Sequence, residues 1–382
     1  MHRTARFIHS SDWQLGMTRA FFTEEAAARF SQSRIDAIEQ LGVLATSHSA
    51  DFIVVAGDVF ESNQLSRTTV LRALEALKSL PVPVFLLPGN HDPLDGSSIF
   101  LTPEFLSAAP HIVVLKDDEP VPVPGLSDVE VVGAPWRTKH PSTDLCARLL
   151  SRLEPSDTAL RVGVAHGQVN TLSPDATRPE IISLSAAEAA VQDGRIHYLA
   201  LGDRHSVTSV GSSGRIWYSG APVATAFDEV DPNKALLVDL SEAECKVDVL
   251  NVGDWHFIAE HRHLNGAEDL KLLAEWMSSL RAKDRTALKI GLTGTISLHC
   301  AAELDQLFDT QAELFASLSR RERTSSLTIV PDELDEDSLA LTGYALEAWR
   351  DLQRAAHSDP VAEDALRLFY RLSGQQSGVI RR

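Results

Sequence analysis

The chain has 382 residues, 44% of them hydrophobic, which is enough for one large domain and a smaller one or two. Its net charge of −18 argues against a free-standing nucleic-acid binder that works by bulk attraction, although bound divalent metals or a basic partner would add positive charge locally. No apolar run approaches the roughly 20 residues of a membrane span, the first residues lack the apolar stretch of a signal peptide, and three widely spaced cysteines suggest neither a disulfide framework nor a thiolate zinc site. We therefore expect a cytoplasmic protein with no membrane contact.

Short apolar runs alternate with helical patterns over the first 200 residues, and a polar, metal-competent residue follows soon after each run. Strands are predicted at 6–8, 52–56, 82–87, 162–165 and 197–201, and they lead to Asp12, Asp58, Asn90, His166 and Asp203. Helices are predicted at 28–47 and 68–80 from apolar residues at helical spacing. Because open α/β sheets bind ligands at the carboxyl ends of their strands, we expect these five strand ends to converge on one site.

The pattern changes to strands alone over residues 216–252. Runs at 216–218, 235–238 and 246–250 predict the second sheet of a layered β sandwich with helices outside. A boundary is expected near Gly253, so that residues 1–253 form the first domain.

Beyond Gly253 the pattern indicates a small α+β domain at 254–331. Its helices are predicted at 268–281 and 301–317, and its strands at 287–292 and 326–330. The tail, 332–382, begins with an acidic stretch and holds two amphipathic helices that carry Trp349, Phe369 and Tyr370.

The strand ends carry the residue types of a two-metal site. Two divalent ions roughly 3.5–4 Å apart can activate water and stabilise an in-line phosphoryl displacement, and they need hard oxygen ligands and imidazoles. The candidates are Asp12, Asp58, Asn90, His166, Asp203 and His205, with His91 and Asp92 next to Asn90. A single Asp after a strand more often caps a turn, and a single His is more often structural. The ordered series of strand ends is the specific signal.

This series resembles the calcineurin-like metallophosphoesterases and, within them, the SbcD-type nuclease subunits of DNA double-strand-break repair. The narrower resemblance lies in residues 11–16, 56–61 and 217–222. It covers about residues 5–250, whereas 255–330 match the family's capping domain only in layout. The resemblance implies an α/β fold: a four-layer metallophosphoesterase β-sandwich flanked by helices, followed by a small α+β capping domain and a helical C-terminal tail.

The resemblance also implies roles for the site residues. Asp58 would bridge two divalent metal ions, typically Mn²⁺, with Mg²⁺ or another divalent metal as the alternative. One ion would be held by Asp12 and His205, and the other by Asn90 and His166. His91 would be the proton donor or transition-state stabiliser for the leaving oxygen, with Asp92 orienting it. Arg204 and Arg137 are the candidate phosphate or DNA contacts.

Three positions depart from the family pattern. Gln14 stands where the family usually has a histidine, and is either a weak neutral metal ligand or a residue that hydrogen-bonds to a ligand. Asp203 also replaces a usual histidine and is a competent hard ligand. The two changes are compatible with two bound metals or with a weakened site that holds one metal strongly. Glu61 stands where some members carry a histidine that helps to place DNA.

Three functions remain open at this point. The first is a DNA nuclease that works with an SMC-like ATPase, on which the tail would dock as it does in SbcD-like proteins. The second is a phosphodiesterase for small nucleotides or other phosphoesters, since one metal core serves many substrates. The third is a scaffold protein that has a degraded metal site and only binds DNA or its partner. The resemblance further implies a homodimer formed through residues 67–80 and 103–109.

Overall fold

The computed structural model describes residues 3–321, 323, 325–330, 341–356 and 359–376. The chain forms two compact units, one made of Met1–Ala20 with Ala27–Trp255 and the other of Phe21–Ala26 with His256–Arg382. The acidic stretch at 331–337, which the sequence indicates to be either a linker or the start of a helix, lies outside the described residues. Each unit is described separately.

The first sheet of the first unit has the strand order β12-β11-β1-β2-β3-β4. From β1 to β4 neighbouring strands are parallel, and β11 joins β1 antiparallel. The strands are β1 (Thr4–Ser10), β2 (Phe52–Val55), β3 (Val84–Leu86), β4 (Ile112–Val114), β11 (Lys234–Ser241) and β12 (Cys245–Asn251). Strand β2 is the run Phe-Ile-Val-Val and is buried throughout, as expected of a parallel strand covered on both faces.

The second sheet has the order β5-β6-β7-β8-β10-β9. Its strands are β5 (Val121–Val123), β6 (Leu126–Gly133), β7 (Leu160–His166), β8 (Tyr198–Gly202), β9 (Thr208–Ser209) and β10 (Ile216–Tyr218). The prediction that residues 216–252 form one sheet is therefore wrong. Strand β10 pairs with β8 in the second sheet, whereas the β11–β12 hairpin extends the first. Apolar alternation marks these segments as strands but does not specify which sheet edge they join.

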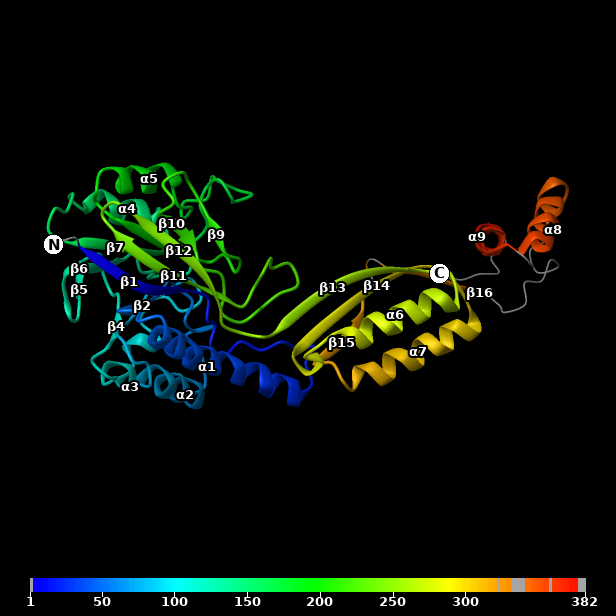
Figure 1. Cartoon of the computed structure of the whole chain (residues 1–382), viewed down its shortest axis with the longest axis horizontal. Coiled ribbons are helices and arrows are strands. Elements are labelled where there is room, and N and C mark those ends of the chain that lie inside the picture. Colours follow the sequence, from blue (N-terminus) through cyan, green and yellow to red (C-terminus); the bar gives the residue numbers. More distant parts are fainter. Residues whose placement is uncertain (1–2, 322, 324, 331–340, 357–358, 377–382) are drawn as a thin grey trace. The chain divides into compact units, whose positions relative to one another are not determined.

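The two sheets pack face to face, and helices cover their outer faces (Figure 1). Between the sheets lie aromatic and branched side chains, among them Phe7, Phe52, Phe85, Val162 and Tyr198. Apolar residues of α1 (Glu24–Ser47) and α2 (Arg67–Lys78) cover the first sheet, and those of α4 (Leu145–Arg152) and α5 (Leu184–Gln192) cover the second. Short helices at η1 (Ile99–Leu101) and α3 (Pro103–Leu106) complete the first side. The expected α/β sandwich flanked by helices is confirmed for the described residues.

The second unit contains a parallel sheet in which β14 pairs with β13, β15 and β16. Its strands are β13 (His256–Leu264), β14 (Thr286–Ser297), β15 (Ser317–Arg320) and β16 (Ser326–Val330), and its helices are α6 (Ala267–Ser279), η2 (Lys283–Arg285) and α7 (Leu298–Ala312). The helix predicted at 301–317 is α7, which ends at Ala312, and Ser317 is instead the first residue of β15. Strand β13 was not predicted, because exposed polar side chains interrupt its apolar pattern.

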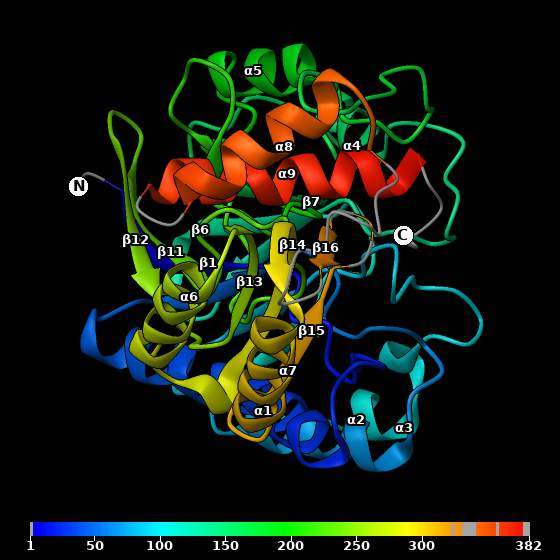
Figure 2. The ribbon, with the colours of Figure 1, turned by 90° about the vertical axis from the view of Figure 1, so that its right-hand side faces the viewer.

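Two further helices, α8 (Tyr344–Ala356) and α9 (Pro360–Gln376), lie side by side (Figure 2). Trp349 and Tyr370 are buried in one cluster with Val330 and Leu366. These two aromatic side chains therefore belong to the core of their own unit and are not available to a partner. Among the described residues, no helix combines the length and apolar character that a membrane crossing requires.

Candidate metal centre

The predicted strand ends come from both sheets and meet at the carboxyl edge of the sandwich. β1, β2 and β3 of the first sheet lead to Asp12, Asp58 and Asn90, and β7 and β8 of the second lead to His166 and Asp203. Asp12, Asp58 and Asp203 have φ values of 55°, 52° and 91°. The left-handed region is costly for most residues and tolerable for Asp. The turns that carry these three carboxylates therefore hold them in a sparsely populated backbone conformation.

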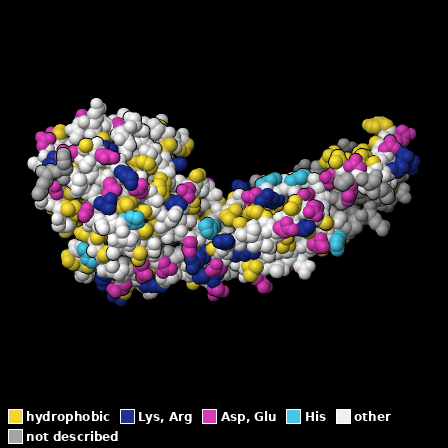
Figure 3. All heavy atoms as spheres, viewed as in Figure 1, with side chains coloured by type: hydrophobic (Ala, Val, Ile, Leu, Met, Phe, Trp, Pro, Cys, Tyr) yellow, Lys and Arg dark blue, Asp and Glu magenta, His cyan; other side chains and the backbone are white. Residues whose placement is uncertain are grey.

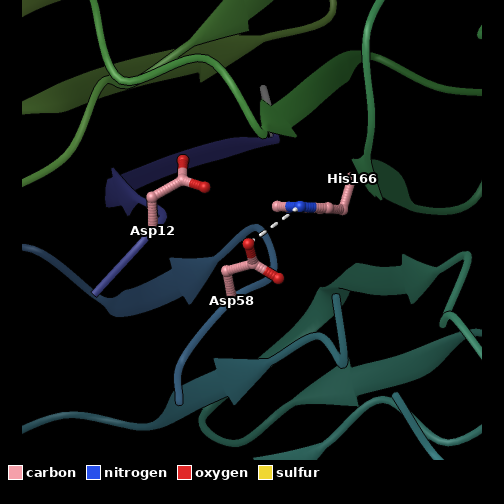
Figure 4. Close-up of side chains that lie close together, drawn as sticks. All are labelled: Asp12, Asp58 and His166. Carbon is pink, nitrogen blue, oxygen red and sulfur yellow. Dashed lines mark ion pairs between the residues drawn. The ribbon is translucent and has the colours of Figure 1, made fainter. Parts of the chain in front are cut away.

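Three buried groups form the centre of the site. Ligand atoms of Asp12, Asp58 and His166 all lie within 4.8 Å of one another. Figure 4 shows the two carboxylates and the imidazole ring pointing toward one another. Each of the three residues is at most 3% exposed. Two buried carboxylates at this separation repel each other unless positive charge lies between or beside them.

The rings of His166 and His91 are held in the same way. His166 Nδ1 is 2.8 Å from the carbonyl oxygen of Ala56, and His91 Nδ1 is 3.0 Å from that of Glu61. Because a carbonyl only accepts, Nδ1 carries the hydrogen in both rings. Each Nε2 then faces Asp58 Oδ2, at 3.4 Å from His166 and 3.9 Å from His91. Fixing Nδ1 in this way is how proteins orient an imidazole toward a metal.

His205 is held by a side chain. Its Nδ1 lies 2.8 Å from Glu229 Oε1 and 2.7 Å from Thr225 Oγ1, while its Nε2 lies 3.7 Å from Asp12 Oδ1. Glu229 and Thr225 were missed from the sequence, because Glu229 is one of three acidic residues in the loop between β10 and β11 and no spacing distinguishes it from Asp228 and Asp231. Because Glu229 holds Nδ1 and Nε2 faces Asp12, His205 belongs to the same centre.

Burial and the neighbouring charges shift the pKa values of the site residues in opposite directions. Burial alone lowers the pKa of His166, but Asp58, Asp12 and Asp203 raise it well above the usual value. Burial likewise opposes protonation of His205, and Glu229 with Asp12 raises its pKa to about 9. The pKa of Asp12 is raised, chiefly by burial. The raised pKa values of His166 and His205 reflect the negative charge that the carboxylates concentrate in the site.

Asp92 has different partners from those expected. Its carboxylate is fully buried and accepts hydrogen bonds from the backbone amides of Gly89, at 2.7 Å, and Phe60, at 2.9 Å. Burial raises the pKa of this carboxyl to about 7. The expectation that Asp92 orients the His91 ring is therefore wrong. The two oxygens of Asp92 accept hydrogen bonds from backbone amides, and the Nδ1–H of His91 donates to the carbonyl oxygen of Glu61. Asp92 shapes the turn that presents Asn90 and His91.

The remaining ligand candidates also lie at the site. Asn90 Oδ1 is 2.7 Å from His166 Nε2, and Asp203 Oδ1 is 3.9 Å from the same nitrogen. The Gln14 side chain is buried, and its Oε1 finds no hydrogen-bond partner among the described residues. A buried acceptor without a donor is costly. Together with the carboxylates and the Nε2 atoms, this oxygen forms a donor set that fits hard divalent cations.

A cleft of about 540 Å³ opens over this centre. It is lined by Gln14, His91, Asp203, Arg204, His205 and Glu229, among others. Arg204 is exposed and its Nε donates to Thr208 Oγ1 at 2.7 Å. Arg137 does not line the cleft, and its guanidinium donates to the carbonyl of Lys116 at 2.6 Å. The cleft therefore favours Arg204 over Arg137 as a candidate phosphate contact.

Comparison with known proteins gives consistent results. The family model for calcineurin-like phosphoesterases matches residues 5–207. The SbcD component of the SbcCD nuclease of Escherichia coli (strain K12) is 27% identical over 279 residues, covering 65% of this chain and 68% of that protein. The SbcD component from Bacillus subtilis (strain 168) is 26% identical over 287 residues, covering 63% and 67%. The DNA double-strand break repair protein Mre11 of Saccharolobus solfataricus is 25% identical over 156 residues, covering 40% and 39%.

The family match spans more than half of the chain and includes every strand end of the centre, from Asp12 to His205. It agrees with the buried Asp12–Asp58–His166 cluster, whose donors suit divalent metals. The chain therefore belongs to the calcineurin-like phosphoesterases, a family of hydrolases with a dinuclear divalent-metal site, and is similar to SbcD.

Proposed function

We propose that this chain hydrolyses phosphodiester bonds of DNA in a metal-dependent reaction, as a nuclease subunit that works with an SMC-like ATPase. The observation that carries the proposal is the buried Asp12–Asp58–His166 cluster beneath a cleft into which His91 projects. The name of the SbcD relative supplies the nuclease activity, and that of the Mre11 relative supplies DNA as the substrate.

The proposed metal positions share Asp58. Its Oδ2 lies 3.4 Å from His166 Nε2, on the side of one proposed ion, and its ligand atom lies within 4.8 Å of that of Asp12, on the side of the other. We assign Asp12, Gln14 and His205 to one divalent ion, and Asn90, His166 and Asp203 to the other, with Mn²⁺ as the proposed metal. Bound divalent ions in such a site generate a nucleophile at neutral pH and offset charge on the phosphoryl oxygens.

His91 is proposed to donate a proton to the leaving oxygen. The Glu61 carbonyl fixes its Nδ1–H, so Nε2 is the atom that reaches a substrate. The side chain is 37% exposed, unlike the fully buried ring of His166, and it lines the cleft. An exposed ring beside the centre can exchange protons with substrate and solvent, which a general acid requires.

Binding of DNA to an acidic chain needs local positive charge. On the face drawn in Figure 3, Lys and Arg side chains are interspersed with Asp and Glu. Arg204 at the cleft is the proposed phosphate contact, and the bound cations add positive charge beside it. A basic partner protein would extend this surface.

The outer face of α9 is the proposed docking surface for the ATPase. Val361, Leu368 and Leu372 are 75%, 44% and 55% exposed on this helix, while Tyr370 points into the unit's own core. An amphipathic helix with an exposed apolar face is typical of helix-in-groove recognition. A homodimer through α2 and α3, where Leu71 and Leu106 are exposed, is proposed from the resemblance.

The function is tested with the purified chain and its bound metal counted. Linear duplex and single-stranded DNA are assayed with Mn²⁺, with and without the ATPase, against a chromogenic bis-aryl phosphodiester, and Asp58→Asn and His91→Ala are run in parallel. We expect DNA cleavage that both substitutions abolish. Cleavage of the small ester alone, even with the ATPase present, would reject the nuclease in favour of a small-substrate phosphodiesterase. Failure on both substrates with near-zero metal content would instead leave a non-catalytic scaffold.

A further inference from the structure

We propose that Glu229 is a positioning residue for the metal centre: its carboxylate holds His205 so that Nε2 presents a lone pair to a divalent cation shared with Asp12. This inference rests on the proposed two-metal site and adds a residue from outside the strand ends. It predicts that the affinity for one of the two cations depends on a side chain that touches neither.

Glu229 is buried, and both of its carboxylate oxygens are hydrogen-bonded. The side chain is 5% exposed, and Oε1 lies 2.8 Å from His205 Nδ1. The backbone amide of Thr225 donates to Oε2 at 2.9 Å, and the Thr225 hydroxyl donates to Oε1. Hydrogen bonds donated to both oxygens fix the orientation of the carboxylate and favour its charged form.

The loop that carries Glu229 is anchored at both ends. At one end, the guanidinium of Arg19 donates through Nη2 and Nε to the carbonyl oxygen of Thr225, at 2.8 and 3.1 Å. At the other, the amide of Val230 donates to Ser206 Oγ at 2.9 Å, next to His205 itself. Because loop and ligand are tied together, the carboxylate cannot drift away from the ring at low cost.

Glu229 lies on the wrong edge of the ring to bind the metal itself. It meets Nδ1, whereas Asp12 faces Nε2, so the imidazole stands between the two carboxylates. In His166 the same place is taken by the uncharged backbone carbonyl of Ala56, and in His91 by the carbonyl of Glu61, with the Glu61 carboxylate farther away at 3.8 Å. A carboxylate on Nδ1 increases the basicity of Nε2 more than a carbonyl does, and loss of such a partner typically costs about 10- to 100-fold in metal affinity.

The test measures cation binding without DNA. Mn²⁺ is titrated into the metal-free full chain by calorimetry, with free Mn²⁺ followed by electron paramagnetic resonance, for wild type and Glu229→Gln. Glutamine keeps the size and one acceptor oxygen but removes the charge. We expect a loss of about 10- to 100-fold in the affinity of one ion, with the other changed less than threefold.

Asp228→Asn is the matched control, since it removes the same charge from the neighbouring residue of the same cleft lining without a contact to His205. We expect it to leave both affinities within threefold of wild type. Equal losses in Asp228→Asn and Glu229→Gln would overturn the proposal, because the effect would then be general electrostatics. Wild-type affinities in Glu229→Gln, with an unchanged melting temperature, would overturn it as well.

A misfolded variant is detected independently. Glu188→Gln alters a half-buried carboxylate that also accepts backbone-amide hydrogen bonds, from Ser212 and Ser213, away from the centre. Its effect on the melting temperature gives the structural cost of this kind of change. The proposed nuclease function has a separate readout. If wild type binds two ions but does not cleave DNA, the proposed nuclease function is rejected. The proposed part of Glu229 in cation binding is then still decided by the titration alone.

Discussion

Gly89 and Asp58 approach so closely that a Cβ on Gly89 would lie 2.2 Å from Asp58 Oδ1 and 2.5 Å from its backbone nitrogen. The contact joins the end of β3 to the end of β2. No side chain fits there, because the obstacles are a backbone atom and the carboxylate at the centre of the site. The glycine of the Gly89-Asn90-His91-Asp92 segment is thus required by space, and the segment and Asp58 form one packed unit.

Gly89→Ala is therefore expected to displace Asp58 and weaken cation binding. We expect the free energy of unfolding to fall by about 1–3 kcal/mol, as for overpacked core positions, and Mn²⁺ affinity to fall by at least tenfold. Chemical denaturation and calorimetry measure the two effects. Gly96→Ala is the control, because nothing lies within 4 Å of a Cβ at that position. Similar behaviour of the two variants would contradict the packing argument.

Replacing His91 by glutamine should separate chemistry from metal binding. If His91 donates the proton to the leaving oxygen, His91→Gln lowers kcat by about 10²- to 10⁴-fold. The two cation affinities should change little, because His91 Nε2 lies 3.9 Å from Asp58 Oδ2 and the ring is the most exposed of the three at the site. Rapid-mix assays at saturating Mn²⁺, together with calorimetry, test this. A large loss of bound metal would assign His91 to the ligands instead.

The sequence was most informative where a motif and a strand end coincide. Asp12, Asp58, Asn90, His166, Asp203 and His205 were predicted to converge, and they lie around one centre. Parallel strands and short turns fix where these residues lie, so local pattern is enough. Glu229 reaches the same centre from a loop whose path depends on contacts with Arg19 and Ser206, which no periodicity encodes.

The features of the fold that were predicted wrongly have a similar physical origin. Strands β11 and β12 were recognised as strands, yet their sheet depends on which edge is free, and β1 offers that edge. The expected contact between Asp92 and the His91 ring was wrong because adjacency to His91 in sequence does not determine where the Asp92 carboxylate points. Its oxygens turn to two backbone amides instead.

His9 makes stability depend on pH below neutrality. It is fully buried, with Nδ1 at 3.1 Å from the Tyr198 hydroxyl and Nε2 at 3.2 Å from the Leu201 carbonyl, and burial lowers its pKa to about 3. Between its unfolded value of about 6.5 and this folded value, the unfolded chain binds the extra proton. This contribution to stability is complete above about pH 6.5 and is lost as the pH falls toward 3.

We expect the His9 contribution to reach a slope of roughly 1.4 kcal/mol per pH unit. Urea unfolding of wild type and His9→Asn between pH 4 and 7 isolates it, because the other titrating groups are common to both chains. The variant should be less stable at pH 7 and its stability should fall less steeply on acidification. Parallel curves would show that His9 titrates in the folded protein as freely as in the unfolded one.

Cation removal should destabilise the first unit, since a bound cation adds to the folded state only. Asp12, Asp58 and His166 are buried together, and their ligand atoms are brought within 4.8 Å only by folding. A cation at a hundred times its dissociation constant stabilises by about 2.7 kcal/mol per site. Chelation should therefore lower the melting temperature by several degrees, and added Mn²⁺ should restore it with a concentration dependence that calorimetry can fit. Asp58→Asn should abolish this response, whereas Glu244→Gln should retain it, because Glu244 is exposed in the β11–β12 turn beside the first residue of β1, at the other end of that strand from the centre. An Mn²⁺-induced shift that persists in Asp58→Asn would place the cation elsewhere in the chain.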